Sequence, residues 1–171
     1  MTEQNHSIKD RLIHAYDQMM EHLHTLIESA GKGTDNLQHL LEKARDEVAE
    51  KDDITREEAQ KVSEYLKRDL HNAREYMHDS SHDMADWLHM DIELIEWNLI
   101  DLFLQAADKT KLDLLLLEEN AKHLNEYHTG EITGPGTLVC TQCGKALHFL
   151  NTGHVPPCSQ CKSTQFRRQS R

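Results

Sequence analysis

Apolar residues recur at intervals of three and four along most of the chain before residue 129, which is the spacing of one face of a helix. The first stripe predicts a helix from about Ile8 to Ala30, which Gly31-Lys32-Gly33 can terminate because glycine suits the left-handed position after a helix. Its apolar positions are Ile8, Leu12, Tyr16, Met19, Met20, Leu23, Leu26 and Ile27.

Two further helices follow from the same spacing. Thr34 or Asp35 can cap the second, whose inner face carries Leu37, Leu40, Leu41, Ala44 and Val48. Thr55 and Glu58 form a capping box, with a hydroxyl first and a carboxylate three residues later, so a third helix is expected to open there. Its inner positions are Ala59, Val62, Tyr65, Leu66, Leu70, Ala73 and Met77.

Residues 84–107 are apolar on two sides. One stripe runs from Met84 to Ala106, and a second consists of Met90, Leu94, Trp97 and Leu104. A helix of this kind is either an inner helix of its own bundle or a surface through which the chain forms a homodimer. The pattern leaves open whether residues 55–79 and 82–107 are one continuous helix. A last helix is expected from Thr110 to near His128.

The pattern changes after residue 128. Residues 129–137 contain three glycines and Pro135 and predict a hinge, because such a stretch cannot continue a helix. Short β-like runs then follow at 137–139, 146–150 and 164–167. The expected fold is mainly α, an acidic antiparallel helical bundle or a set of long helical hairpins with a small C-terminal β ribbon. The expected units are a helical domain at 1–128, which should fold alone, the hinge at 129–137 and the ribbon at 138–171.

Charge separates the same two regions. Hydrophobic residues make up only 37% of the 171 residues and charged ones 29%, which fits long amphipathic helices. Residues 1–129 carry 29 acidic and 14 basic side chains, whereas residues 130–171 carry one acid and five bases. The helical region is therefore strongly acidic and the ribbon basic. No apolar run is long enough to span a membrane, and the first residues lack the pattern of a secretion signal, so a cytoplasmic protein is expected.

Four cysteines carry the most specific chemistry. Cys140 and Cys143 form one C-x2-C turn, Cys158 and Cys161 form another, and the chain contains no other cysteine. Two such turns can hold one metal ion in a tetrahedron of thiolates, and a reducing cytoplasm favours metal over disulfides. Since four protein ligands leave no open position, the metal is expected to be structural. Zinc, one ion per chain, is the expected metal, and a single iron is the alternative.

A helical region followed by Leu-Val-Cys-x-x-Cys-Gly and Pro-Cys-x-x-Cys resembles the bacterial zinc-ribbon-containing proteins typified by YbeL. The segments 65–70, 97–99 and 107–110 add to the resemblance, which covers nearly the whole chain. The family implies a zinc ribbon on a helical body and implies no established activity.

The thirteen histidines raise a second metal hypothesis. Glu75-x-x-His78 has the spacing of di-iron carboxylate bundles, with His82 and His89 near the same face, and Glu21-x-x-His24 could supply a second motif. A helical bundle with a C-terminal four-cysteine domain also resembles the rubrerythrins, which are peroxide-reducing di-iron enzymes. Both glutamates fall opposite the apolar stripes, so solvent-facing side chains are the expected outcome. His148 and His154 could replace a cysteine ligand, but four cysteines already complete the shell.

These observations favour a non-catalytic binding or adaptor protein whose ribbon engages a protein partner. A rubrerythrin-like redox enzyme is one alternative. A nucleic-acid-associated factor is another, using the basic tail formed by Lys162, Arg167, Arg168 and Arg171 beside Phe166. No motif of a nucleotide-binding or hydrolytic site is present, and the acidic body would repel polyanions.

Overall fold

A computed structural model describes residues 2–30, 37–51, 54–78 and 125–169. The doubly apolar segment 84–107, the homodimer expected through it and most of the helix expected from Thr110 lie outside the described residues. Residues 80–83, where the predicted helices 55–79 and 82–107 would either join or break, also lie outside the described residues.

Three helices form the N-terminal half, as predicted. They are α1 (Thr2–Ala30), α2 (Leu37–Lys51) and α3 (Arg56–His78). The predicted capping box opens α3, since the Thr55 N–H donates to Glu58 at 2.7 Å and the Glu58 N–H donates to the Thr55 hydroxyl at 3.1 Å. This exchange satisfies two backbone donors that a helix start leaves without intrahelical partners.

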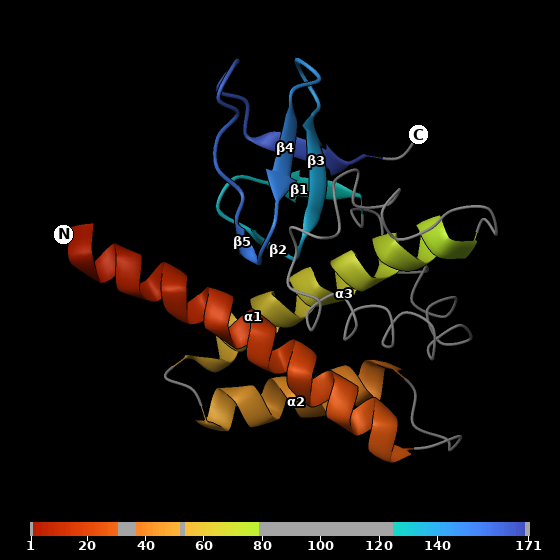
Figure 1. Ribbon diagram of the computed structural model, residues 1–171. Coiled ribbons are helices and arrows are strands. Elements are labelled where there is room, and N and C mark those ends of the chain that lie inside the picture. The colour runs from red at the N-terminus through yellow and green to blue at the C-terminus, as the bar shows by residue number, and fades with distance from the viewer. Residues whose placement is uncertain (1, 31–36, 52–53, 79–124, 170–171) are drawn as a thin grey trace.

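The predicted inner faces of the helices meet in one hydrophobic core. Figure 1 shows α1 crossing α2 and α3 at the base of the molecule, and each pair of these helices is in contact. The buried residues include Tyr16, Met19, Met20 and Leu23 from α1, Leu40, Leu41, Ala44 and Val48 from α2, and Val62, Leu66 and Leu70 from α3. Ile132 from the C-terminal region completes this core and is fully buried in it.

Two antiparallel sheets follow. The first has the strand order β1-β6-β3-β4. Its strands are β1 (Glu126–His128), β3 (Gly136–Cys140), β4 (Ala146–Phe149) and β6 (Gln165–Arg168). The second pairs β2 (Ile132–Thr133) with β5 (Gly153–His154). The β-like runs near 137, 146 and 164 are thereby confirmed as β3, β4 and β6.

The prediction of a mainly α fold, a helical bundle or long hairpins with only a small ribbon, is wrong. Six strands in two sheets follow the three helices within the described residues. The helix expected to end near His128 is replaced at 126–128 by β1, where Tyr127 pairs with Phe166 and is buried between a more exposed residue on either side. That alternation has the period of a strand, not of a helix. Sheet pairing with β6, far along the chain, outweighs the local helical pattern.

The ribbon packs directly against the helices. In Figure 1 the sheets lie above α1 and α3, and β2 contacts both helices while β5 contacts α1. Thr152 also donates a 2.6 Å hydrogen bond to Asp17 of α1. Residues 129–137, the expected hinge, contain β2 and the first residues of β3, and residues 132–137 are buried. These contacts favour one cooperative unit over a helical region that folds alone.

Within the described ranges, none of the three helices is both long enough and apolar enough to cross a bilayer.

Candidate metal centre

Two turns with the same backbone pattern carry the four cysteines. In the first, which joins β3 to β4, the Gly144 N–H donates to the Cys140 carbonyl at 3.0 Å and the Cys140 N–H donates to Lys145 at 2.9 Å. In the second, the Lys162 N–H donates to Cys158 at 3.0 Å and the Cys158 N–H donates to Ser163 at 2.9 Å. Gly144 and Lys162 occupy the corresponding positions and both have positive φ, 71° and 62°.

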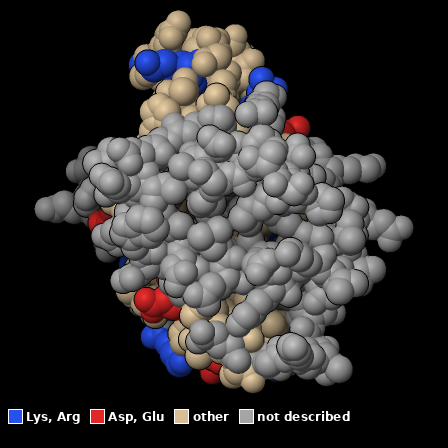
Figure 2. Space-filling model, turned by 45° about the vertical axis from the view of Figure 1, so that its right-hand side comes forward, with Lys and Arg blue, Asp and Glu red and all other residues tan. Residues whose placement is uncertain are grey.

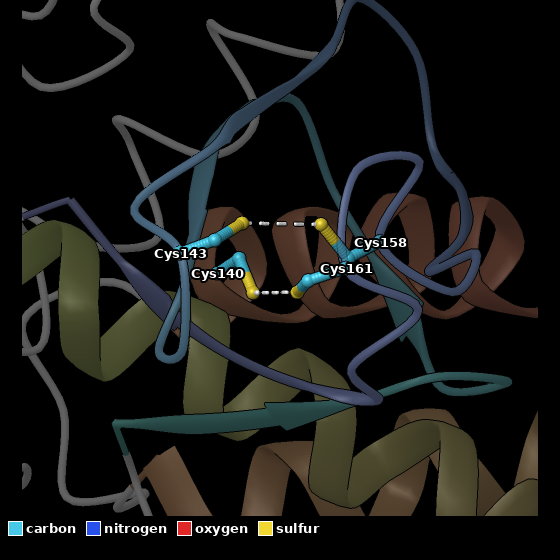
Figure 3. Close-up of side chains that lie close together, drawn as sticks. All are labelled: Cys140, Cys143, Cys158 and Cys161. Atoms are coloured by element: carbon cyan, nitrogen blue, oxygen red, sulfur yellow. Dashed lines mark hydrogen bonds between the residues drawn. The ribbon is translucent and has the colours of Figure 1, made fainter.

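The four sulfur atoms face one another between the two turns, as Figure 3 shows. The Cys140 and Cys161 sulfurs are 3.5 Å apart, and the Cys143 and Cys158 sulfurs are 3.6 Å apart. All four lie within 4.8 Å of one another. A disulfide would need a distance of about 2.05 Å, so the cysteines are free thiols.

This spacing fits a metal ion. Sulfurs at the corners of a tetrahedron whose metal–sulfur distance is about 2.3 Å are separated by roughly 3.8 Å. The Cys140–Cys161 and Cys143–Cys158 sulfur pairs fall just below that separation. The four cysteines are therefore positioned to bind one metal ion.

The thiols also differ in their tendency to lose a proton. The Cys143 N–H donates to the Cys140 sulfur and lowers the pKa of Cys140 to about 6. The Cys161 N–H likewise lowers the pKa of Cys158. The Ser163 N–H acts in the same direction on Cys161, but burial and the other three sulfurs outweigh it and raise the pKa of Cys161 to about 12. Four facing thiols cannot all ionise without a cation, because the negative charges repel one another.

The site is held at the end of the ribbon far from the helices. β3 runs from Gly136, beside the helices, to Cys140 at the opposite end of the sheet (Figure 1). Cys140 and Cys158 are buried in a second core with Tyr127, Leu138, Phe149, Val155 and Phe166. In the described part of the chain, this is the one cluster of histidine, cysteine or acidic side chains close enough to share an ion.

The histidine and carboxylate candidates are not brought together among the described residues. Glu21 is exposed on α1. His148 Nδ1 lies 2.8 Å from the Thr137 hydroxyl, and the ring nitrogens of His154 lie near the Gly130 and Lys9 carbonyls. The side chains of Glu75, His78, His82 and His89 lie outside the described residues.

Sequence reasoning missed a buried polar cluster that joins the ribbon to the helices. Asp69 of α3 is fully buried and accepts hydrogen bonds from Tyr16, Tyr127 and Thr133 and from the Gly134 N–H. The sequence did hold a signal for this cluster. Asp69 lies three residues after Leu66 on the inward face of the helix, and a charged residue on an apolar stripe needs buried partners.

Two arginines surround this carboxylate. The Arg68 guanidinium stacks on Tyr127 with 3.7 Å from its carbon to the ring centre, and it donates to Glu131 and to the Ile132 carbonyl. Arg168 of β6 lies 3.7 Å from Asp69 and donates to Thr133 and Pro135. Arg168, expected in an exposed basic tail, is instead buried in this cluster.

Comparison with known proteins gives a consistent assignment. A family model described as a zinc-ribbon containing domain matches residues 6–170. The chain is 28% identical over 145 residues to the uncharacterised protein YbeL of Escherichia coli strain K12, a match that covers 85% of this chain and 89% of that protein. The YbeL proteins of the O6:H1 and O157:H7 strains match equally. No solved structure matches.

Proposed function

Because the chain belongs to the family of proteins with this zinc-ribbon containing domain, we propose that its cysteines bind one structural zinc ion and that its ribbon is a non-catalytic, protein-binding head. The observation that carries the proposal is the convergence of four sulfurs within 4.8 Å at the far end of the ribbon. The ligands are Cys140, Cys143, Cys158 and Cys161.

A structural role follows from the number of ligands. Four thiolates complete the tetrahedral shell of zinc and leave no position for water or substrate. The second core, which includes Cys140 and Cys158, contains few large apolar side chains. Metal binding would add the stability that such a small core lacks.

Zinc is preferred to iron because the family model describes a zinc ribbon, whereas four sulfurs alone would fit either metal. A rubrerythrin-like di-iron site gains no support, since Glu21 is exposed. Among the described residues, the cysteine cluster would therefore carry all of the metal chemistry.

A binding role is supported by where the two turns lie. The turn residues Thr141, Gln142, Ser159 and Gln160 are exposed at the end of the ribbon opposite the helices (Figure 1). The metal would make this end rigid, and a rigid, polar, solvent-exposed surface can dock on a partner without a large cost in conformational entropy. The acidic helical body would keep polyanions away from the rest of the molecule.

Site-specific photo-crosslinking in cells tests the binding role. A photo-reactive residue at Gln160 should yield a discrete crosslinked protein that is absent when Cys143→Ser is introduced into the same chain. The matched control places the same residue at Gln60, an exposed position on α3. Equal crosslinking from both positions, or a crosslink that persists without the cysteine, would assign binding to the helical body and contradict the proposal.

A further inference from the structure

The two metal-binding turns differ at one corresponding position. Gly144 and Lys162 each donate a backbone hydrogen bond to the first cysteine of their turn, and each has a left-handed backbone conformation. Glycine adopts that conformation freely, whereas a residue with a Cβ is strained in it. Among the described residues, Lys162 is the one non-glycine residue with a positive φ.

The side chain of Lys162 takes no part in the backbone hydrogen bond that requires this conformation. Its side chain is exposed, and within the described part of the chain it forms no salt bridge. Lys145, at the end of the first turn, is exposed in the same way. A strained backbone position that carries an exposed functional group is a feature of binding sites.

The segment that carries these two lysines lacks acidic side chains. Residues 132–169 contain no aspartate or glutamate, so the negative charge in this segment would come from the zinc-bound thiolates alone. Figure 2 shows Lys and Arg atoms at the top of the view. An anionic group that approaches the two turns would meet no carboxylate from residues 132–169. The exposed Glu126 of β1 is in register with Arg167 of β6.

We propose that the turn end of the ribbon docks an acidic segment of another protein, with Lys145 and Lys162 as its cationic contacts. This inference rests on the proposed function and names the partner's chemistry. A nucleic acid fits less well, because its binding depends on neutralising many phosphates, whereas two lysines flanked by exposed Thr141, Gln142, Ser159 and Gln160 match a short peptide with a few carboxylates and hydrogen-bonding groups.

The competing role for Lys162 is to balance the metal centre itself. Four thiolates and one dication carry about two negative charges, and a nearby ammonium group would stabilise them. The two roles separate experimentally. A balancing lysine would affect metal affinity and ribbon stability, whereas a docking lysine would affect only the partner.

The test uses the full chain loaded with zinc and a short fluorescent peptide of alternating glutamate and serine. Its isostere with glutamine in place of glutamate is the neutral probe, and a fluorescent single-stranded oligonucleotide of similar length is the second polyanion. Fluorescence anisotropy should show binding of the acidic peptide and weaker binding of both other probes. Lys162→Gly should weaken the acidic peptide's binding by about two- to fivefold, as expected for one exposed charge pair. Lys145→Gln should weaken the acidic peptide's binding by a similar factor.

Lys162→Gly is well suited to this test because it relieves the backbone, so it should leave the zinc content and the melting temperature unchanged or slightly raised. Lys162→Arg should retain peptide binding, and Lys51→Gln on α2 is the matched control for loss of an exposed lysine.

Unchanged peptide binding in Lys162→Gly would overturn the inference. So would a loss of zinc affinity in that variant, or tighter binding of the oligonucleotide than of the peptide. In each of these cases a Gln160 crosslink that needs Cys143 would still support the proposed function.

Discussion

The phenolic oxygen of Tyr127 in β1 donates a 2.8 Å hydrogen bond to the carboxylate of Asp69 in α3 across 58 positions of the chain. Both side chains are fully buried. Tyr16 of α1 donates to the other carboxylate oxygen at 2.8 Å. One carboxylate therefore joins two helices to the sheet that ends at the cysteines, and we expect this junction to make the helices and the ribbon dependent on each other.

Replacing Asp69 by alanine should destabilise the protein by about 3–5 kcal/mol, because the buried Arg68 and Arg168 would lose the carboxylate that faces both of them. Arg68 would keep its ion pair with Glu131. Urea unfolding of the zinc-loaded protein measures the change. Asp46→Ala, which removes an exposed acid from α2, should cost less than about 1 kcal/mol. A similar small cost for Asp69→Ala would show that the cluster does not hold the two parts together.

Gly136→Ala should be strongly destabilising, by roughly 2 kcal/mol or more. Gly136 has φ of 143°, and a Cβ there would overlap the Arg168 guanidinium, which is held by Pro135 and Thr133. The matched control is Gly153→Ala, whose Cβ would meet the Phe149 ring at an ordinary 3.6 Å. Thermal melting of the two variants should separate them clearly, and equal melting temperatures would contradict this account of Gly136.

The buried tyrosine predicts a loss of stability at high pH. Burial raises the pKa of Tyr127 to about 12, with Asp69 acting in the same direction and Arg168 opposing it. The unfolded chain's tyrosine has a pKa of about 10. The folded state therefore favours the neutral phenol, so this contribution is fully present below pH ~10 and is lost as the pH rises toward ~12. The expected slope is about 1.4 kcal/mol per pH unit.

Urea unfolding at a series of pH values in that window, for the wild type and Tyr127→Phe, isolates the contribution. The variant should be less stable at neutral pH by about 1 kcal/mol, because it lacks the hydrogen bond to Asp69, and its stability should fall less steeply with pH. Parallel curves for the two proteins would show that Tyr127 does not titrate as its burial implies.

The helices were predictable from the sequence because their signals are local. The helix predicted from the first apolar stripe ends at Ala30, where α1 ends, and the Thr55–Glu58 capping box lies within three residues. The convergence of the cysteines was predictable for a related reason, since two C-x2-C turns can meet around one ion. The assignment of zinc to those cysteines remains a proposal.

The junction was not predictable, because its partners lie far apart in sequence. Arg168 looked like part of a solvated tail, and only the pairing of β6 with β1 and β3 carries it to Asp69. Tyr127 fell at the end of a helical pattern and became a strand through its pairing with Phe166. Residues 129–137 had the composition of a hinge, yet Ile132 fills the helical core.

Removal of the metal should loosen α3 as well as the ribbon. Without the metal, β3 and the turn that precedes β6 would lose their link through Cys140 and Cys158, so Tyr127 and Arg168 would be held less firmly against Asp69. Hydrogen exchange should rise at residues 66–72 of α3 when zinc is chelated, and much less at residues 40–48 of α2, which pack within the helical core. Unchanged exchange in α3 would show that the helices do not sense the metal site.

The binding of one structural zinc ion by the four cysteines underlies the proposed function, and native mass spectrometry with elemental analysis of the purified protein tests it directly. We expect one zinc per chain in the wild type and loss of that zinc in Cys143→Ser. The matched control is Ser159→Ala, a change at an exposed position within the second cysteine turn, which should keep the metal. Iron in place of zinc, or a wild-type protein that carries no metal when purified under reducing conditions, would contradict it.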